Sequence, residues 1–357
     1  MRTILTVLTL ILLISACKEK KAEVDVKDEE TTINITLDNN ETDKKVDVFV
    51  GGKLFTSYLY ADDISVLKKT TLYPIIAANG EAITRGYPLN TRPNERTDHP
   101  HHIGAWFNYG DVNGLDFWGN SDEIKTPKEK LGTIRHDKIV SQKNGDESST
   151  LVVSTNWLNP DNSILMKEET MFVFSAEEGK RIIDRNTTFK ALDKTVLFND
   201  TKEGMFAIRT ARELEHPSDG PVTLSDANGN KTDVPVTDNT GVSGQYLSSE
   251  GLTGTDVWGT RAKWMALTGT INKKDVTVVI MDQPKNVGYP TYWHARGYGL
   301  FAANPLGPKA FTDGKEPPIN FTLEPNTEVS FSYRIAVLDG IKDSTELETE
   351  FKKFTSK

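Results

Sequence analysis

Short, alternating apolar runs bounded by turn residues are the feature that most restricts the fold of this chain. β-Branched and aromatic residues dominate these runs, and polar turn sequences rich in Asn, Asp and Gly separate them. The pattern predicts strands at 32–37, 47–50, 54–60, 150–156, 171–175, 187–189, 205–210, 264–270, 276–281, 321–323 and 329–338. Because so many short strands are predicted, we expect an all-β fold. Because no unit repeats along the chain, the expected form is one large antiparallel β-sandwich over residues 31–342.

Helical periodicity is convincing only at the end of the chain, in residues 343–357. Ser344 is placed to cap a helix there, and Leu347, Phe351 and Phe354 fall on one face that can pack on the sandwich. The stretch 226–254 is rich in Gly, Ser, Thr, Asp and Asn, which predicts a long loop or arm.

The N-terminus has the form of a lipoprotein export signal. Met1-Arg2 is followed by an apolar run at 4–14 that is too short to span a bilayer, and then by Ile14-Ser15-Ala16-Cys17. We expect residues 1–16 to be a signal peptide, Cys17 to be lipidated, and the charged residues 17–30 to be a disordered tether. The expected location is the outer membrane, with the domain facing the periplasm or the cell surface. An ordinary cleaved signal peptide with a chance cysteine is the alternative.

Charge and cysteine content restrict the partners and the chemistry. The chain has 42 Lys and Arg against 51 Asp and Glu, a net charge of −9, which argues against binding to nucleic acid. Cys17 is the only cysteine, so neither a disulfide nor a thiolate nucleophile is available. We expect a monomer that contacts the membrane only through its lipid, and an acidic substrate would need a local basic pocket.

A histidine cluster stands out among the candidate functional residues. His99, His101 and His102 are three of the six histidines, and in an extended chain the first two would face one side and His102 the other. We interpret them as acid/base or substrate-binding imidazoles, with a polar loop braced by hydrogen bonds as the alternative. No cofactor is expected, although a divalent metal held by His99, His101 and His294 is a lesser alternative.

Two further stretches carry candidate residues, namely 206–214 and 257–264, the latter followed by 290–305. His294 and Arg296 share one face if 293–296 is a strand, and an arginine beside an imidazole suits a site that holds a carboxylate while a proton moves. A buried structural pair is the alternative for these two, and a surface salt bridge is the alternative for Arg209 and Glu213. The predicted catalytic residues, expected to line one concave pocket, are His101, His102, Arg209, His294 and Arg296. The predicted substrate-binding residues are Arg92, Asp98, His99, Asn108, Glu213, Trp258, Tyr298 and Asn304.

These stretches, above all 98–118 and the Trp-His-x-Arg-x-Tyr-Gly-Leu sequence at 293–300, resemble the PmoA-like domain of unknown function. That family consists of exported bacterial proteins, often encoded among polysaccharide-utilisation genes. The resemblance covers roughly 73–340, and 323–340 is similar to the closing strand of galactose-mutarotase-like supersandwich domains. This family resemblance implies a supersandwich domain that acts on or binds sugars. His216 belongs to no shared motif.

The residue types favour elimination over glycoside hydrolysis, which usually needs paired carboxylates. The candidate stretches contain few carboxylates, namely Asp98, Asp111, Asp116 and Glu213, but are rich in His, Arg, Tyr and Asn. Such a site can clamp the carboxylate of a uronic acid, remove the C5 proton and protonate the group that leaves C4. We expect a dehydratase ahead of a polysaccharide lyase, acting on acidic oligosaccharides such as those from ulvan-like algal polysaccharides.

Three alternatives remain open at this point. A sugar mutarotase or epimerase would need one base and one acid, which His102 and Glu213 could provide. The others are a glycoside hydrolase and a non-catalytic glycan-binding lipoprotein.

Overall fold

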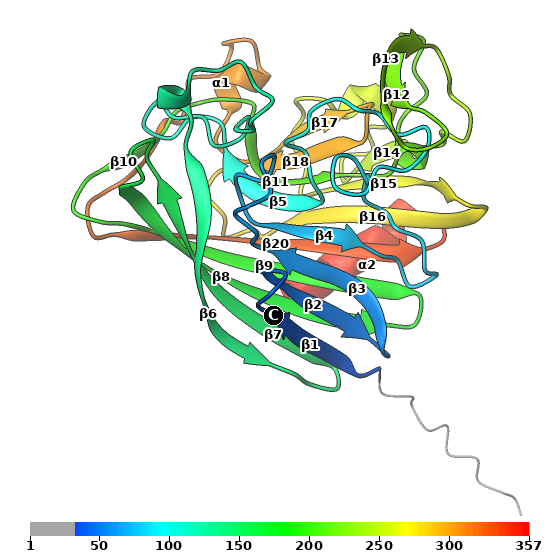
Figure 1. Cartoon of the computed structure of the whole chain (residues 1–357), viewed down its shortest axis with the longest axis horizontal. Coiled ribbons are helices and arrows are strands. Elements are labelled where there is room, and N and C mark those ends of the chain that lie inside the picture. Colours follow the sequence, from blue (N-terminus) through cyan, green and yellow to red (C-terminus); the bar gives the residue numbers. More distant parts are fainter. Residues whose placement is uncertain (1–32, 357) are drawn as a thin grey trace, which may run out of the picture. The chain divides into compact units, whose positions relative to one another are not determined.

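Two antiparallel eight-stranded sheets form the body of the fold in residues 33–356, the part of the chain that this computed structural model describes (Figure 1). The first sheet has the order β1 (Ile35–Asn40), β2 (Lys45–Val50), β3 (Lys53–Leu59), β4 (Thr71–Ile75), β5 (Ala105–Tyr109), β11 (Gly204–Arg209), β18 (Leu300–Asn304) and β17 (Tyr292–Arg296). The second has the order β14 (Gln245–Ser248), β15 (Trp264–Ile271), β16 (Lys274–Asp282), β20 (Glu328–Asp339), β9 (Lys180–Ala191), β8 (Ile164–Glu177), β7 (Ser148–Leu158) and β6 (Thr133–Lys143). The predicted signal peptide, Cys17 and the tether lie outside the described residues.

Smaller elements stand around these sheets. β10 (Val196–Phe198) pairs with β19 (Phe321–Leu323), and β12 (Val222–Ser225) pairs with β13 (Lys231–Val236) in a projecting arm. The helices are α1 (Pro308–Phe311) and α2 (Ser344–Thr355), with 3-10 turns at Lys128–Lys130, Arg212–Leu214 and Gly254–Val257. No helix among residues 33–356 is long and apolar enough to cross a membrane.

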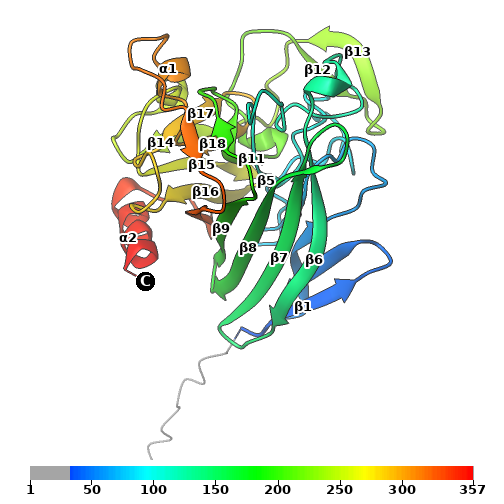
Figure 2. The same ribbon diagram turned by 90° about the vertical axis from the view of Figure 1, so that its left-hand side faces the viewer.

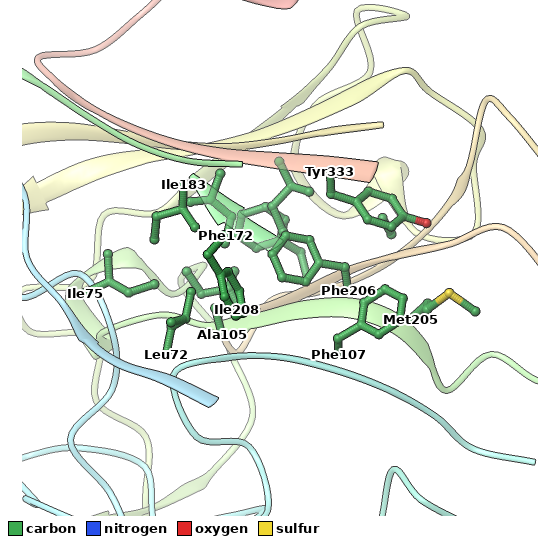
Figure 3. Close-up of a cluster of buried hydrophobic side chains, with 14 of the residues drawn as sticks. Leu72, Ile75, Ala105, Phe107, Phe172, Ile183, Met205, Phe206, Ile208 and Tyr333 are labelled. Carbon is green, nitrogen blue, oxygen red and sulfur yellow. The ribbon is translucent and has the colours of Figure 1, made fainter. Parts of the chain in front are cut away.

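Aromatic rings from both sheets fill the space between them (Figure 3). On the first sheet Phe107 and Phe206 point inward, and on the second sheet Phe172 and Tyr333 meet them. The ring centroids of Phe206 and Tyr333 are 5.5 Å apart. This core follows from the period of two along each strand, because alternate residues face the partner sheet.

Helix α2 covers part of the outer face of the second sheet, over β9, β15, β16 and β20 (Figure 2). Leu347, Phe351 and Phe354 are buried against those strands, as the sequence predicted. The cap is Asp343 rather than Ser344: its carboxylate accepts hydrogen bonds from the N–H groups of Thr345 and Glu346 at 2.8 and 2.9 Å. Asp is as good a cap as Ser, so the start of the helix moved by one residue.

The prediction of a large antiparallel β-sandwich with a short C-terminal helix is confirmed. The stretch 226–254, predicted as a long loop or arm, contributes β13 to the projecting arm but also contains a strand that was not predicted, β14 of the second sheet. β14 lies at the edge of the second sheet and pairs with β15, so a neighbouring strand stabilises a sequence whose own strand propensity is weak.

Candidate functional site

The outer face of the first sheet carries the candidate site, where β5, β11, β18 and β17 lie side by side. In β17, Trp293 and Ala295 are part of the core between the sheets, so His294 and Arg296 point to the opposite side. Trp106 and Leu300 from the neighbouring strands pack together on that same outer face. Strand pairing thus joins segments about 195 residues apart, since β5 and β18 both pair with β11.

The histidine loop that precedes β5 is held by a buried arginine. The Arg85 guanidinium donates to the backbone carbonyls of Asp98 at 2.8 Å, His99 at 2.9 Å and His102 at 3.1 Å. Gly104 then turns the chain into β5 with a φ of +60°, and a Cβ there would lie 2.1 Å from the carbonyl oxygen of Leu72. Only glycine fits this turn, so the backbone conformation between the loop and the strand is fixed.

A cavity of about 540 Å³ lies between this loop and β17. The predicted residues that line it are His99, His101, His102, His294, Arg296 and Tyr298. The expectation that His102 would face away from His99 and His101 is wrong. His99 has a φ of +43°, so the chain turns there and all three rings line the cavity, with the rings of His99 and His102 stacked at 4.8 Å.

Two predicted residues lie directly behind the cavity wall. Arg209 is fully buried and donates to the Asp98 carboxylate at 2.7 Å, and Arg85 donates to the same oxygen at 2.8 Å. Burial alone would raise the pKa of Asp98, but Arg209, His99 and Arg85 hold it well below its usual range. The alternative of a surface salt bridge between Arg209 and Glu213 is therefore wrong.

Other predicted substrate-binding residues do not reach the cavity. Asn108 is fully buried between Trp106 and Phe117, and the Asn304 amide donates to the carbonyl of Thr201 at 2.8 Å. Their side chains brace neighbouring segments.

Arg92 and Glu213 line a separate cavity of about 500 Å³. Arg92 pairs there with Glu95 at 2.8 Å. Both residues were predicted because they lie within candidate stretches of the sequence, and membership of a stretch does not determine the direction in which a side chain points.

His294 is arranged as a neutral imidazole with one free nitrogen. Its Nδ1–H donates to the carbonyl of Lys202 at 2.9 Å, so the lone pair in the neutral ring is on Nε2. Nε2 makes no hydrogen bond with any residue in 33–356, and the ring lines the cavity. Burial, assisted by the charge of Arg296, lowers the pKa of His294 to about 4, against the attraction of Glu203.

Arg296 presents a guanidinium that no carboxylate among residues 33–356 neutralises. Its charged group lies 3.6 Å from the centroid of the Trp258 ring, so Trp258 supports it from one face. Among the described residues, neither a carboxylate nor a carbonyl accepts a hydrogen bond from this side chain. The alternative of a buried structural pair is not what the structure shows, since the N–H edges of Arg296 remain available to a ligand.

His101 and His102 are also held as neutral rings. Burial is the main cause that lowers the pKa of each, and nearby cationic groups, including Lys69 and Arg209, act in the same direction. Nδ1 of His101 and Nε2 of His102 are buried without a hydrogen-bond partner in the described part of the chain. Unpartnered buried groups of this kind are unusual, and here they belong to a cavity wall.

Sequence reasoning missed several residues of the site. Lys202 and Glu203 line the cavity beside His294, and Asp116 and Trp118 line it beside His102. Burial would raise the pKa of Glu203, but hydrogen bonds from Lys202 and Thr201 hold it below its usual value. The signal was faint, since residues 201–203 are an ordinary polar turn before β11, and only the fold brings them to β17.

Lys69 is a second omission, hidden behind the histidine loop. It is buried, donates to the carbonyl of His101 at 2.7 Å and lies 5.2 Å from the Trp106 ring centroid. Burial lowers its pKa to about 7. It therefore supports the loop while carrying a charge that titrates near neutrality.

The metal alternative finds no support in the geometry. Nowhere in residues 33–356 do three or more His, Cys, Asp or Glu side chains come together as metal ligands would. His99, His101 and His294 share the cavity but are not arranged as one ligand set.

Solved structures of sugar enzymes show a distant similarity. The galactosidase domain of an alpha-galactosidase–sucrose kinase is 8% identical with a TM-score of 0.40, over 85% of this chain and 42% of that one. For an alpha-galactosidase from Geobacillus stearothermophilus the identity is 10% and the TM-score 0.39, over 85% and 41%. The galactose 1-epimerase of Lactobacillus acidophilus is 8% identical with a TM-score of 0.35, over 87% and 100%. This chain thus spans less than half of each galactosidase.

Comparison of sequences, rather than of structures, identifies the protein family of this chain. No curated protein matches the chain. Residues 45–352, however, match the family of unknown function DUF6807 along nearly the whole described sandwich, so the chain belongs to that family.

Proposed function

We propose that this protein is a carbohydrate-active enzyme that eliminates water, or a glycosidic substituent, across C4 and C5 of a uronic acid in acidic oligosaccharides. The observation that supports this most is the pair formed by His294 and Arg296 on one cavity wall. His294 offers a free Nε2 lone pair, and Arg296 offers a guanidinium without a hydrogen-bond or ion-pair partner in the described part of the chain. A base beside an unneutralised cation is what the removal of a proton next to a carboxylate requires.

The carboxylate of the substrate would pair with Arg296 through two parallel hydrogen bonds. This pairing has a second effect, because the charge of Arg296 is one cause of the low pKa of His294. A bound carboxylate offsets that charge and makes His294 a stronger base in the complex than in the free protein. The C5 proton then passes to Nε2 of His294 while negative charge develops on the carboxylate oxygens.

In this proposal Tyr298 is the acid that protonates the leaving group. It lines the cavity, and burial raises its pKa, so it is a phenol at neutral pH. As the C4–O bond breaks and the C4–C5 double bond forms, Tyr298 gives its proton to the departing oxygen. The proton taken by His294 returns to Tyr298 through water, and the net products are an unsaturated uronate and water or a free sugar hydroxyl.

A dehydratase is placed ahead of a lyase. A cavity of about 540 Å³ accommodates a ligand the size of a small oligosaccharide end. Because a lyase that cleaves within a polymer needs a longer groove, the cavity favours action at a chain end.

Sugar mutarotation or epimerisation is the second candidate. Tyr298 and His294 line the same cavity, and one acid and one base around a sugar ring suffice for that reaction. A glycan-binding role would use Trp118 of the cavity wall for contact with the sugar, without any chemistry. Membership of an exported, polysaccharide-utilising PmoA-like group is part of the first proposal.

The deciding experiment uses acidic algal or host oligosaccharides that end in a uronic acid. We expect the ultraviolet absorbance of a 4,5-unsaturated uronate to increase with time. The matched control is the same oligosaccharide with its carboxyl groups reduced to alcohols, which should give no signal because Arg296 has no anion to bind. Faster anomer interconversion without absorbance would establish the second candidate, and binding without any product would leave the glycan-binding role.

A further inference from the structure

His102 and His294 have opposite hydrogen-bonding arrangements although they line the same cavity. Arg209 Nη1 lies 3.4 Å from Nδ1 of His102. A guanidinium can only donate, so Nδ1 of His102 accepts and the ring proton is on Nε2. In His294 the carbonyl of Lys202 can only accept, so its proton is on Nδ1. The N–H of His102 is therefore buried in the cavity wall without an acceptor among residues 33–356, whereas His294 has a lone pair on Nε2.

Arg209 has little freedom to change this arrangement. Its other terminal nitrogen donates to Asp98 at 2.7 Å, and its charged group lies 4.6 Å from the centroid of the Tyr298 ring. Asp98 is in turn fixed by Arg85 at 2.8 Å. The Arg209 guanidinium is thus fixed by Asp98 and by the Tyr298 ring, and its Nη1 is directed at His102.

The His102 ring is also unable to gain a second proton easily. It stacks on His99 at 4.8 Å and on Trp106 at 5.2 Å, and the cations Arg209 and Arg85 oppose a second proton on it, although both also pair with Asp98. Its Nε2–H finds no acceptor within residues 33–356, although the ring lines the cavity. A buried donor without an acceptor is costly, and a bound ligand would relieve that cost.

We propose that His102 donates a hydrogen bond from Nε2 to the oxyanion that develops on the substrate, and that Arg209 is the positioning residue that fixes this tautomer. The inference rests on the proposed function, since the oxyanion is the enolate-like carboxylate formed when the C5 proton leaves. His102 does not transfer a proton in this scheme. It stabilises charge while His294 takes the proton, and a neutral imidazole donor is suited to that role.

The first test compares replacements at His102. Glutamine keeps an N–H donor but cannot act as an acid or base, whereas alanine keeps neither. We expect His102→Ala to lower kcat by about 100-fold or more, as the loss of one oxyanion donor does, while His102→Gln stays within about 10-fold of the wild type. His294→Gln, the matched control, should be as inactive as His294→Ala because a base is lost. Equal losses for His102→Gln and His102→Ala would overturn the inference.

The second test reads the tautomer directly by ¹⁵N NMR of histidine-labelled protein, with the His102 signals assigned from the His102→Gln spectrum. We expect the wild type to show a proton on Nε2 of His102 from pH 5 to pH 9, and D-glucuronate to shift that resonance. In Arg209→Leu the Nδ1–H tautomer should appear. Arg334→Leu is the matched control, since it removes another buried arginine, paired with Asp184 at 2.5 Å, but leaves the His102 spectrum unchanged.

These spectra do not depend on turnover, so the two proposals fail separately. A wild type that never forms unsaturated product would overturn the elimination reaction. A proton on Nδ1 of His102, or an Nε2–H signal that glucuronate does not perturb, would overturn the role of His102.

Discussion

Charge pairing at the level of single residues separates Arg296 from the buried arginines of this protein. Arg209 pairs with Asp98 at 2.7 Å, and Arg334 pairs with Asp184 through two hydrogen bonds. A buried arginine without such a partner would be strongly destabilising. Arg296 is half-buried, rests on Trp258 and has no partner of this kind within residues 33–356. Its charge is therefore available for binding.

Replacement of this arginine and of its neighbouring histidine should impair turnover in different ways. We expect His294→Ala to lower kcat by about 100-fold or more through loss of the base. Arg296→Lys should lower kcat/KM by about 10- to 100-fold, because a point charge replaces a planar clamp. Steady-state kinetics on the unsaturated product measures both. His136→Gln serves as the control, since His136 packs on Tyr60 and does not line the cavity. Full activity of His294→Ala would contradict the assignment.

The low pKa of His294 makes stability depend on pH. Unfolding returns the pKa of this imidazole to its ordinary value near 6.5. Below that pH the unfolded chain therefore binds more protons than the folded one. The free energy of unfolding should therefore decrease as the pH is lowered from 6.5 to 4. At pH 5, His294 should lower it by about 2 kcal/mol relative to pH 7.5.

Urea unfolding of the wild type and of His294→Gln at both pH values measures this contribution. The difference between the two proteins should change by that amount between pH 7.5 and pH 5. If both proteins lose stability equally on acidification, the ring is not held neutral in the fold.

Among the elements, α2 and the cavity lie on opposite outer faces of the sandwich. α2 packs on β9, β15, β16 and β20 of the second sheet, whereas His294 and Arg296 point outward from β17 of the first. Because the double layer of strands separates them, stability changes at α2 should leave the chemistry unaffected.

Mutations in α2 test this separation. Asp343→Ala removes the capping box and should cost about 1 kcal/mol, and Phe351→Ala should cost about 3–5 kcal/mol through the cavity it leaves. Thr349→Ala, on the exposed side, should stay within about 0.5 kcal/mol. Thermal unfolding gives these values, and kcat at a temperature where all variants are folded should not change. A large loss of kcat in Phe351→Ala would show that the two faces are coupled.

At the scale of the whole molecule, an acidic chain surrounds a site that needs a cation. The net charge is −9, yet Arg296 and Lys202 both line the cavity. Lys202 is offset by Glu203 at 2.6 Å, so Arg296 supplies the local attraction for an anion. We expect the affinity for acidic sugars to come from this short-range contact rather than from the global field.

Attachment to a membrane through Cys17 is the remaining prediction at this scale. Labelling cells with a lipid precursor should tag the protein, and Cys17→Ala should be recovered in the soluble fraction with its activity intact. Fractionation and labelling together measure this outcome. Membrane retention of the Cys17→Ala protein would contradict the lipid anchor.

The sequence by itself determined the local features of this protein. Alternation of apolar residues is a property of each strand alone, so segments such as 264–270 and 276–281 could be predicted as strands without their neighbours. The same period put His294 and Arg296 on one face. The apolar stripe of α2 was equally visible, because it depends on residues only three or four positions apart.

Only the tertiary structure decided which distant segments meet. The pairing of β11 with β5 and β18 brought Tyr298 and Glu203 to the histidine loop, and no short-range pattern encodes that order of strands. The same packing excluded Arg92 and Glu213, whose sequence neighbourhood had suggested a role. The tautomers depend on it too, because the proton on an imidazole is set by the group that its other nitrogen contacts across the fold.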